Sequence, residues 1–162
     1  MVAVNDFFNL SEQTYSQLPE GLFRFQNPTP VSSPTCVIWN ESLAHQLGLP
    51  IQQNDKVWRS QCFSGNQRLG GARPLAQAYA GHQFGHLAML GDGRALLLGE
   101  WVGPGGHRVD IQLKGAGQTP YSRRGDGRAV LRSSIREFLC IEAMHGLGIP
   151  TTRALALTGS SG

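Results

Sequence analysis

The sequence has few charged residues and no long apolar run, and these two scarcities exclude several classes of protein. Asp, Glu, Lys and Arg make up 15% of the 162 residues, against about a quarter in a typical globular domain. The longest uninterrupted aliphatic run, at residues 95–98, is far too short to cross a bilayer. The net charge of +3 is too small to indicate a nucleic-acid-binding face. We therefore expect neither a membrane nor a nucleic acid as a partner.

Cysteines are also few, and their spacing carries no metal or disulfide signature. Cys36, Cys62 and Cys140 are widely separated and odd in number, and no Cys-x-x-Cys occurs. We expect them to be small core residues rather than nucleophiles. The first ten residues lack the basic region of a secretory signal. Together these absences predict a cytoplasmic protein in a reducing compartment.

Glycine and apolar residues are plentiful instead. Hydrophobic residues make up 40% of the sequence, enough for one domain with its own core, and the 21 glycines cluster after residue 65. We divide the chain into an N-terminal extension, residues 1–72, and a denser series of strands and turns, residues 73–162. The extension is expected to pack on the rest of the chain through six large apolar side chains: Phe7, Phe8, Tyr15, Leu18, Phe23 and Phe25.

The extension itself predicts one short strand and one short helix. Residues 36–39 are apolar, and Asn40 is a favourable N-cap for a helix whose apolar face includes Leu43. Gly48 and Pro50 are expected to end this helix. Residues 51–72 are polar and without a clear period, so we predict a loop with one helical turn at most.

The segment 74–114 predicts a helix, an apolar strand-like run at 87–90 and two further strands. Residues 74–80 are compatible with a helix that has Pro74 at its first position. Residues 95–101 are typical of a buried strand. From 107 to 114 apolar and polar residues alternate strictly, which predicts a half-buried strand ending in Lys114.

The clearest helix signal lies further along the chain. Ser134 and Glu137 have the Ser-x-x-Glu spacing of a capping box, and an apolar side follows them. Gly146, Gly148 and Pro150 are expected to end the helix. Residues 151–158 predict another strand.

A five-residue motif, Gly-Asp-Gly-Arg-Ala, occurs twice, at 91–95 and at 125–129. At the first site Gly91, Gly93 and Arg94 have two interpretations. A glycine-rich turn between strands can direct backbone amides at phosphate oxygens, with the arginine adding charge-assisted bonds. Alternatively, Asp-Gly marks a tight hairpin turn. It is neither a Walker A loop nor a Rossmann fingerprint, because no helix follows the glycines directly.

Lys114 and Glu137 each have an ordinary explanation, but their order along the chain favours a functional one. Alone, Lys114 would be a solvated lysine and Glu137 a capping residue. The predicted order is strand, glycine turn, strand, turn, strand ending in lysine, then a helix bearing glutamate. A protein-kinase N-lobe has this order, and there the lysine holds nucleotide phosphates while the glutamate orients it. The expected fold is therefore α+β, an antiparallel sheet with one αC-type helix.

Two further groups of residues carry weaker signals. Five arginines, at 123, 124, 128, 132 and 136, lie in and after a glycine-rich loop, and some are expected to face inward toward phosphate. Gly115 and Gly117 follow Lys114 and would permit close approach of a ligand. His82 and His86 have the spacing of a helical zinc pair, but Gln83 stands where a metalloprotease has glutamate, so a metal role is not expected.

Five long stretches of the sequence resemble the selenoprotein O (YdiU) family. They are Tyr-Ala-Gly-His-Gln-Phe-Gly at 79–85, Leu-Gly-Asp-Gly-Arg-Ala at 90–95, Gln-Leu-Lys-Gly-Ala-Gly-Gln-Thr-Pro-Tyr-Ser-Arg at 112–123, Gly-Asp-Gly-Arg-Ala-Val-Leu-Arg-Ser-Ser-Ile-Arg-Glu-Phe at 125–138 and Leu-Gly-Ile-Pro-Thr-Thr-Arg-Ala-Leu at 147–155. The resemblance extends over nearly the whole chain.

The resemblance implies a pseudokinase-like fold and a protein adenylyltransferase activity. Members bind ATP in a flipped orientation and transfer AMP to hydroxyl groups of Ser, Thr or Tyr in proteins, and some transfer UMP with manganese. The implied nucleotide-binding residues are Gly91, Gly93, Arg94, Lys114, Asp126 and Gly127, with Glu137 pairing to Lys114. The implied cofactors are ATP as substrate and Mg²⁺ or Mn²⁺.

The resemblance also implies that the chain corresponds to an N-lobe without its C-lobe. Family members are much longer, and their catalytic aspartate, metal-binding residues and further nucleotide-binding arginines lie in that C-lobe. We therefore expect no catalytic residue and no metal ligand within this chain, and no activity from it alone. Two alternatives remain: a non-catalytic module that binds nucleotide or protein, or self-associates through the face meant for a C-lobe, and, least favoured, a hydride-transfer nucleotide domain.

Overall fold

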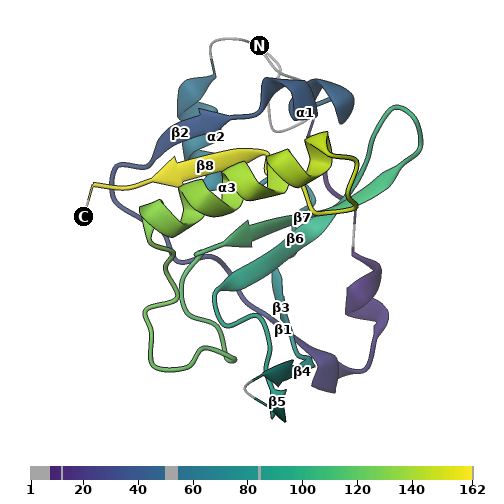
Figure 1. The fold of residues 1–162 in the computed structure, drawn as a ribbon, viewed down its shortest axis with the longest axis vertical. Helices are drawn as coiled ribbons and strands as arrows, with labels where there is room; N and C mark the ends of the chain where they lie inside the picture. Colours follow the sequence, from purple (N-terminus) through teal and green to yellow (C-terminus); the bar gives the residue numbers. More distant parts are fainter. Residues whose placement is uncertain (1–7, 12, 50–54, 84, 162) are drawn as a thin grey trace.

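The fold is a mixture of antiparallel sheets and short helices. The computed structural model describes residues 8–11, 13–49, 55–83 and 85–161 (Figure 1), so the predictions for Phe7 and Pro50 lie outside the described residues. The elements, in chain order, are η2 (Thr14–Gln17), η3 (Glu20–Leu22), β1 (Phe23–Phe25), β2 (Thr35–Trp39), α1 (Glu41–Gln46), α2 (Lys56–Phe63), β3 (Leu75–Gln77), β4 (Ala80–Gln83), β5 (His86–Met89), β6 (Ala95–Val102), β7 (Arg108–Lys114), α3 (Leu131–Gly146) and β8 (Ala156–Gly159). The α+β prediction is confirmed.

The largest sheet has the strand order β1-β3-β6-β7, and all its neighbours are antiparallel. Its central strand β6 carries three consecutive buried leucines, Leu96, Leu97 and Leu98. In β7 Ile111 and Leu113 are buried, while the polar residues of the strand, at 108, 110, 112 and 114, are exposed. The predictions of a buried strand and of a half-buried alternating strand are both confirmed.

A second, two-stranded sheet pairs β2 with β8, and α2 packs against both strands (Figure 1). The predicted N-cap of α1 is confirmed, because Asn40 Oδ1 accepts a hydrogen bond from the Leu43 amide at 3.0 Å. The prediction of a loop for residues 51–72 is wrong over α2. Cys62 and Phe63 of this helix are buried in an aromatic cluster, and this packing stabilises a helix whose local sequence is weakly apolar.

The N-terminal segment is anchored as expected at some positions but not at others. Phe8 is fully buried and packs edge-on against Trp101 and Trp58, and Phe23 is buried in a second cluster. Leu18 and Phe25, which were expected to be anchors, are exposed. A polar contact adds to the apolar ones, because the buried carboxylate of Glu100 accepts hydrogen bonds from the Thr14 amide and hydroxyl.

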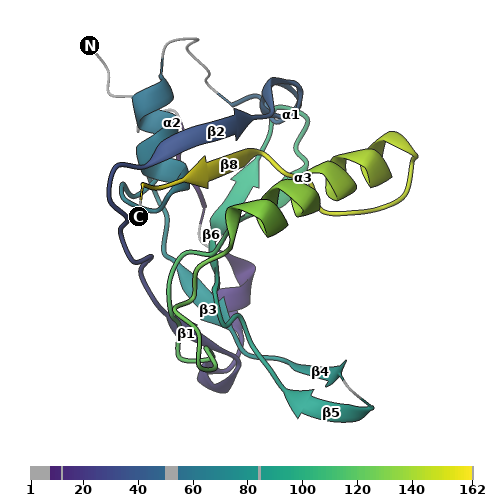
Figure 2. The ribbon, with the colours of Figure 1, turned by 60° about the vertical axis from the view of Figure 1, so that its left-hand side comes forward.

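Residues 75–83 and 85–97 pair along one long hairpin. β3 pairs with β6, β4 pairs with β5, and the amides of Leu90 and Asp92 donate to the carbonyls of Tyr79 and Gln77 between these pairs. Figure 2 shows the β4–β5 tip extending away from the rest of the fold. The predicted helix over 74–80 is therefore wrong, since this segment is extended. The tight turn predicted at 91–94 is also wrong, because the hairpin turns between β4 and β5.

Helix α3 differs from its prediction at its start. It begins at Leu131 after an N-cap at Val130, and the Ser134 hydroxyl donates to the Val130 carbonyl within the first turn. The capping-box interpretation of Ser134 and Glu137 is therefore wrong. The helix ends at Gly146 as predicted, and Gly148 has the positive φ typical of a helix end. No helix among the described residues has the length and apolar character to cross a membrane.

Candidate functional site

An ion pair between two predicted site residues joins β7 to α3. Lys114 is the last residue of β7, and its Nζ donates to Glu137 Oε1 at 2.6 Å. Because α3 begins earlier than predicted, Glu137 lies in the second turn, where its carboxylate is not used for capping. The side chains are 48% and 44% exposed. An ion pair this exposed contributes at most about 1 kcal/mol to stability.

Arg94 lies at the same end of the sheet as Lys114. In the β6–β7 register Ala95 is opposite Lys114, so Arg94 precedes β6 where β7 ends. The Arg94 carbonyl accepts the Gly115 amide at 2.7 Å and the Ala116 amide at 3.2 Å. The structure thus brings three predicted residues, Arg94, Lys114 and Glu137, to the end of the sheet where β6 begins and β7 ends. We call this end the Lys114 edge.

The glycines near this edge pack the chain tightly against itself. A side chain at Gly91 would meet the ring of Tyr121 and the Gln77 carbonyl, and one at Gly127 would lie 2.1 Å from the backbone of Gly117. Gly127 has a φ of +73°, a conformation that L side chains rarely adopt. Glycine at these positions therefore allows the loops 91–94, 115–122 and 125–129 to touch.

The amides of several glycines also donate hydrogen bonds to carbonyl groups of the chain. The Gly93 amide donates to the Gly91 carbonyl, Gly115 to Arg94 and Gly117 to Gly127. Of these three amides, only that of Gly93 belongs to the motif at 91–95, and it is bonded within the chain. Gly115 and Gly117, expected to admit a ligand, instead face Ala129 and Thr29. A nucleotide-binding role for Gly91, Gly93 and Gly127 stays a prediction.

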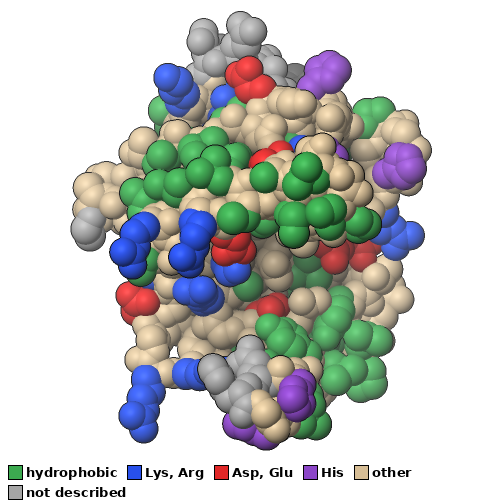
Figure 3. Space-filling model, viewed as in Figure 1, with side chains coloured by type: hydrophobic (Ala, Val, Ile, Leu, Met, Phe, Trp, Pro, Cys, Tyr) green, Lys and Arg blue, Asp and Glu red, His purple; other side chains and the backbone are tan. Residues whose placement is uncertain are grey.

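The second Gly-Asp-Gly-Arg motif forms a turn of its own. Asp126 Oδ1 accepts the Arg128 amide at 2.8 Å, and the Arg128 guanidinium donates to the Pro30 carbonyl at 3.1 Å. Arg128 is half-buried, whereas the other four arginines of the predicted cluster are exposed. Lys and Arg side chains gather at the N-terminal end of α3 (Figure 3). The expected inward orientation therefore holds only in part, for Arg128.

Asp92 is a residue whose role the sequence reasoning missed. It is buried, its Oδ2 accepts the Gln77 amide at 3.1 Å, and its carbonyl accepts the Thr119 hydroxyl at 2.6 Å. Burial raises the pKa of this carboxyl, and the hydrogen bond from Gln77 opposes that rise in part. Asp92 therefore fastens the loop 119–122 to the end of β3. Its position between two glycines was the one sequence signal that could have indicated a special role for this residue.

Glu142 was also missed, and it has the densest set of polar partners of any described carboxylate. Oε1 accepts from Arg153 Nε at 2.9 Å and from the Ala154 amide at 3.0 Å. Oε2 accepts from Arg153 Nη2 and from Asn40 Nδ2, both at 2.8 Å. These hydrogen bonds, those from Arg153 foremost, lower the pKa of Glu142 to about 2. No spacing rule connects residues 40, 142 and 153, so the sequence offered no signal.

The cysteines and histidines do not form a site. Cys62 is buried, and burial raises its pKa to about 12, which confirms its core role. Cys140 is exposed, so the prediction of a core position is wrong for it. His82 and His86 lie on paired strands, not on a helix. Among the described residues, no three His, Cys, Asp or Glu side chains are grouped to hold a metal ion.

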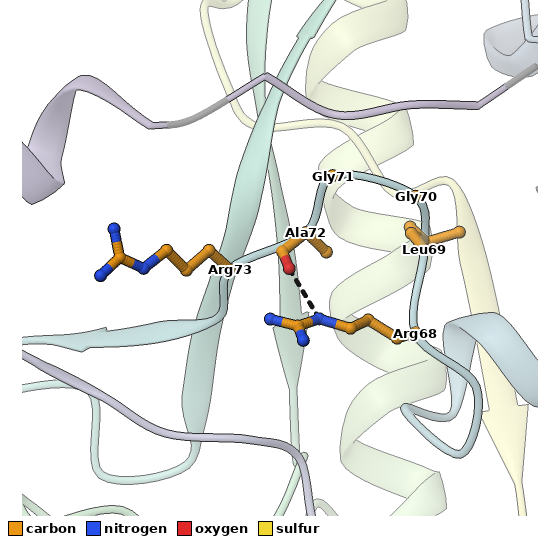
Figure 4. Close-up of a pocket in the computed structure, with 6 residues that line it drawn as sticks. All are labelled: Arg68, Leu69, Gly70, Gly71, Ala72 and Arg73. Atoms are coloured by element: carbon orange, nitrogen blue, oxygen red, sulfur yellow. Dashed lines mark hydrogen bonds between the residues drawn. The ribbon is translucent and has the colours of Figure 1, made fainter. Parts of the chain in front are cut away.

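One surface pocket, of about 580 Å³, lies away from the predicted site residues in the sequence. It is lined by residues 68–73, and Arg68 Nε donates to the Ala72 carbonyl across it (Figure 4). Both of its arginines, Arg68 and Arg73, are exposed. It shares no residue with the Lys114 edge, and we assign no ligand to it.

The chain is similar to a family of nucleotidyltransferases along nearly its whole length. The model of the family described as "Protein adenylyltransferase SelO" matches residues 7–162. A protein nucleotidyltransferase YdiU from Nitrosococcus oceani is 57% identical over 152 residues, which is 93% of this chain and 31% of the relative. A YdiU protein from Geobacillus kaustophilus is 59% identical over 150 residues, 90% of this chain and 30% of the relative. Another, from Clostridium botulinum, is 55% identical over 162 residues, which is 98% of this chain and 32% of the relative. The chain thus spans about a third of these relatives.

Proposed function

We propose, from the premise that this chain belongs to the SelO family of protein adenylyltransferases, that its Lys114 edge binds the phosphates of a nucleoside triphosphate. The observation that carries the proposal is the ion pair of Lys114 with Glu137 at the end of β7, where Arg94 precedes the paired strand β6. The carboxylate holds the ammonium group in one place, so that a phosphate meets an oriented cation.

The arrangement around this pair supports a kinase-like N-lobe. The antiparallel strands β3, β6 and β7 are neighbours in one sheet, β7 ends in the lysine, and α3 supplies the glutamate. We propose residues 73–162 as this lobe and residues 1–72 as an extension that packs on it. In protein kinases a lysine and a helix glutamate arranged in this way position the nucleotide phosphates.

Positive charge at the edge supports a phosphate ligand rather than a neutral one. Arg94 and Lys114 lie at one end of β6 and β7, and exposed arginines gather at the adjoining end of α3 (Figure 3). Gly91, Gly93, Asp126 and Gly127 are proposed as the rest of the nucleotide-binding set. Their contribution is to hold the loops that carry Arg94 and Arg128 in fixed positions.

The reaction we propose for the full-length family member is transfer of AMP, or UMP, to a protein hydroxyl. The hydroxyl oxygen forms a bond to the α-phosphorus of the triphosphate, its proton passes to a base, and pyrophosphate leaves. Lys114 and Arg94 would neutralise negative charge on the phosphates during that step. The proposed substrates are ATP or UTP and a protein with an accessible Ser, Thr or Tyr.

A catalytic metal does not fit the described residues. The family resemblance implies Mg²⁺ or Mn²⁺, but Asp92 is buried and bonded to Gln77, and Asp126 closes its own turn with Arg128. No cluster of three ligating side chains exists among the described positions. We therefore derive no step through a metal from this chain, and propose that the 162 residues alone transfer no nucleotide.

Titration calorimetry with ATP and an assay with labelled ATP test the proposal together. We expect weak binding, with a dissociation constant above the micromolar range, and no label transferred to the chain itself in the presence of magnesium. Micromolar affinity would contradict the expectation that most nucleotide contacts lie elsewhere in the family fold. Self-labelling would contradict the proposed inactivity. Complete absence of ATP binding at millimolar concentrations would remove the proposed phosphate site.

A second function is favoured by the exposed apolar side chains of α3. The helix buries no residue, and Leu131, Leu139 and Met144 are exposed. A chain with such a face can act as a non-catalytic module that docks a protein. Concentration-dependent oligomers in light scattering, without any ATP binding, would favour this alternative over the nucleotide site.

A further inference from the structure

Helix α3 carries the glutamate of the Lys114 pair, yet apolar burial does not fix the helix in place. It contains 16 residues, and none of them is buried. It packs against β8, and its apolar side is half-buried at best. Something other than core packing must therefore determine how far Glu137 lies from Lys114.

The Lys114–Glu137 pair is too weak to position the helix by itself. Both side chains are nearly half exposed, and an exposed pair with two long side chains contributes little once their lost freedom is counted. The pair is better regarded as a contact that forms when α3 is already in place.

Glu142 supplies the stronger attachment. Its carboxylate accepts four hydrogen bonds from two other parts of the chain, the residues before β8 and the residue before α1. Asn40 is itself held in two directions, because its Oδ1 caps α1 and its Nδ2 also donates to the Ala154 carbonyl. The Glu142 side chain is 23% exposed and that of Arg153 is 20% exposed, so water weakens these bonds much less than those of Glu137.

Glu142 and Glu137 are rigidly connected. They lie five residues apart on one helix, about 7.5 Å along its axis. Fixing Glu142 against Arg153, Ala154 and Asn40 therefore fixes where Glu137 stands relative to β7.

We propose that Glu142 is a positioning residue: its contacts with Arg153, Ala154 and Asn40 hold α3 so that Glu137 reaches Lys114. The importance of this for nucleotide binding rests on the proposed function, whereas the coupling of the two contacts does not.

Substitution by glutamine separates this role from simple loss of a side chain. All four groups that face Glu142 are donors. In Glu142→Gln one oxygen becomes an NH₂ that meets donors only, so at least one partner is lost while size is kept. We expect α3 to shift or loosen and Glu137 to leave Lys114.

The sequence offers an internal reference for measuring this. It contains two lysines, Lys114 and Lys56, and Lys56 is exposed on α2. A brief pulse of an amine-acylating reagent, read by peptide mass spectrometry, gives the ratio of labelling at Lys114 to that at Lys56. Glu137→Gln defines the ratio for a released Lys114. We expect Glu142→Gln to raise the ratio by about two- to fivefold, close to the Glu137→Gln value.

Two controls exclude trivial causes. Glu20→Gln makes the same charge change at an exposed residue of η3, and should leave the ratio unchanged. Leu75→Val removes volume from a fully buried position in the cluster of Phe23 and Leu97, so it lowers the melting temperature without touching α3. Its ratio should also stay at the wild-type value.

The outcomes are separable from those of the nucleotide test. A wild-type ratio in Glu142→Gln, with a raised ratio in Glu137→Gln, would overturn the proposal. A ratio that rises equally in Leu75→Val would overturn it too, because general loosening would then explain the effect. If the wild-type chain binds no ATP but Glu142→Gln still releases Lys114, the positioning role stands and the proposed function fails.

Discussion

Lys114 Nζ and Glu137 Oε1 lie 2.6 Å apart although the two residues are separated by 23 positions and belong to a strand and a helix. Neither residue is buried, so water can solvate each charge and neither needs the other to compensate for a desolvation cost. We propose that the pair orients the ammonium group of Lys114. The ammonium group lies at the end of the sheet where β6 begins and β7 ends, and Arg94 precedes β6 at that end.

The first prediction concerns this pair. Lys114→Ala should weaken ATP binding by about tenfold or more, because a charge-assisted bond to phosphate contributes about 1.5–3 kcal/mol. Nuclear magnetic resonance titration with millimolar ATP suits weak binding, and Lys56→Ala is the matched control. Equal affinities for the two alanine variants would exclude Lys114 from the ligand site.

The pair also shows what the sequence could and could not predict. The alternation of residues 107–114 predicted β7, because a strand with one buried face needs that period. The glutamate was found through its order after the lysine, although the capping box proposed to explain it does not form. Helix α2 was missed because its apolar stripe is weak, and the aromatic cluster that stabilises it comes from residues far away in the sequence.

The second prediction concerns the glycine contacts between loops. Gly127→Ala should destabilise the chain by about 2–5 kcal/mol, because its new Cβ meets the Gly117 backbone and its φ of +73° is strained for alanine. Gly125→Ala is the matched control, since nothing lies within 4 Å of its added Cβ. Urea unfolding measures both. If the two variants lose equal stability, close packing does not explain why the motif at 125–129 has glycine at position 127.

The third prediction concerns the thiols. Cys140 is exposed, and should react with a disulfide reagent in the folded protein at the rate of a free thiol. Cys62 should react only after unfolding, since burial raises its pKa to about 12. Cys36 should lie between them, because burial raises its pKa and the Arg59 charge opposes that rise in part. Cys140→Ser should remove the fast phase alone, and a fast phase that persists would contradict this assignment.

The candidate site was predictable only where chemistry and chain order coincide. Lys114, Glu137 and Arg94 could be selected because their motifs and order have a known use. Glu142 and Asp92 could not, because each acts through partners that only the folded chain brings near: Arg153 and Asn40 for one, Gln77 and Thr119 for the other. The close approach of the chain to itself at Gly91 and Gly127 was not predicted either, because it depends on residues such as Tyr121 and Gly117 that folding brings near.

The fourth prediction is a pH dependence of stability that belongs to Glu142. Hydrogen bonds from Arg153, Ala154 and Asn40 hold its folded pKa at about 2, below the ordinary value of 4.5. A carboxyl whose pKa is lowered by folding stabilises the protein fully above its unfolded pKa, and this stabilisation is lost as the pH falls from about 5 toward 2. With 23% of the side chain exposed, we expect the contribution to be about 1–2 kcal/mol.

Comparison with Glu142→Gln isolates this contribution from other acidic groups, such as Glu100, whose pKa is also lowered, chiefly by the Thr14 amide. Urea unfolding of both proteins at a series of pH values should give a stability difference that is full near pH 6 and shrinks toward zero by about pH 2. Glu20→Gln, which makes the same substitution at an exposed residue of η3, is the matched control. A Glu142→Gln difference that stays constant across this range would mean that the four hydrogen bonds do not depend on the charge, and that α3 is held by other contacts.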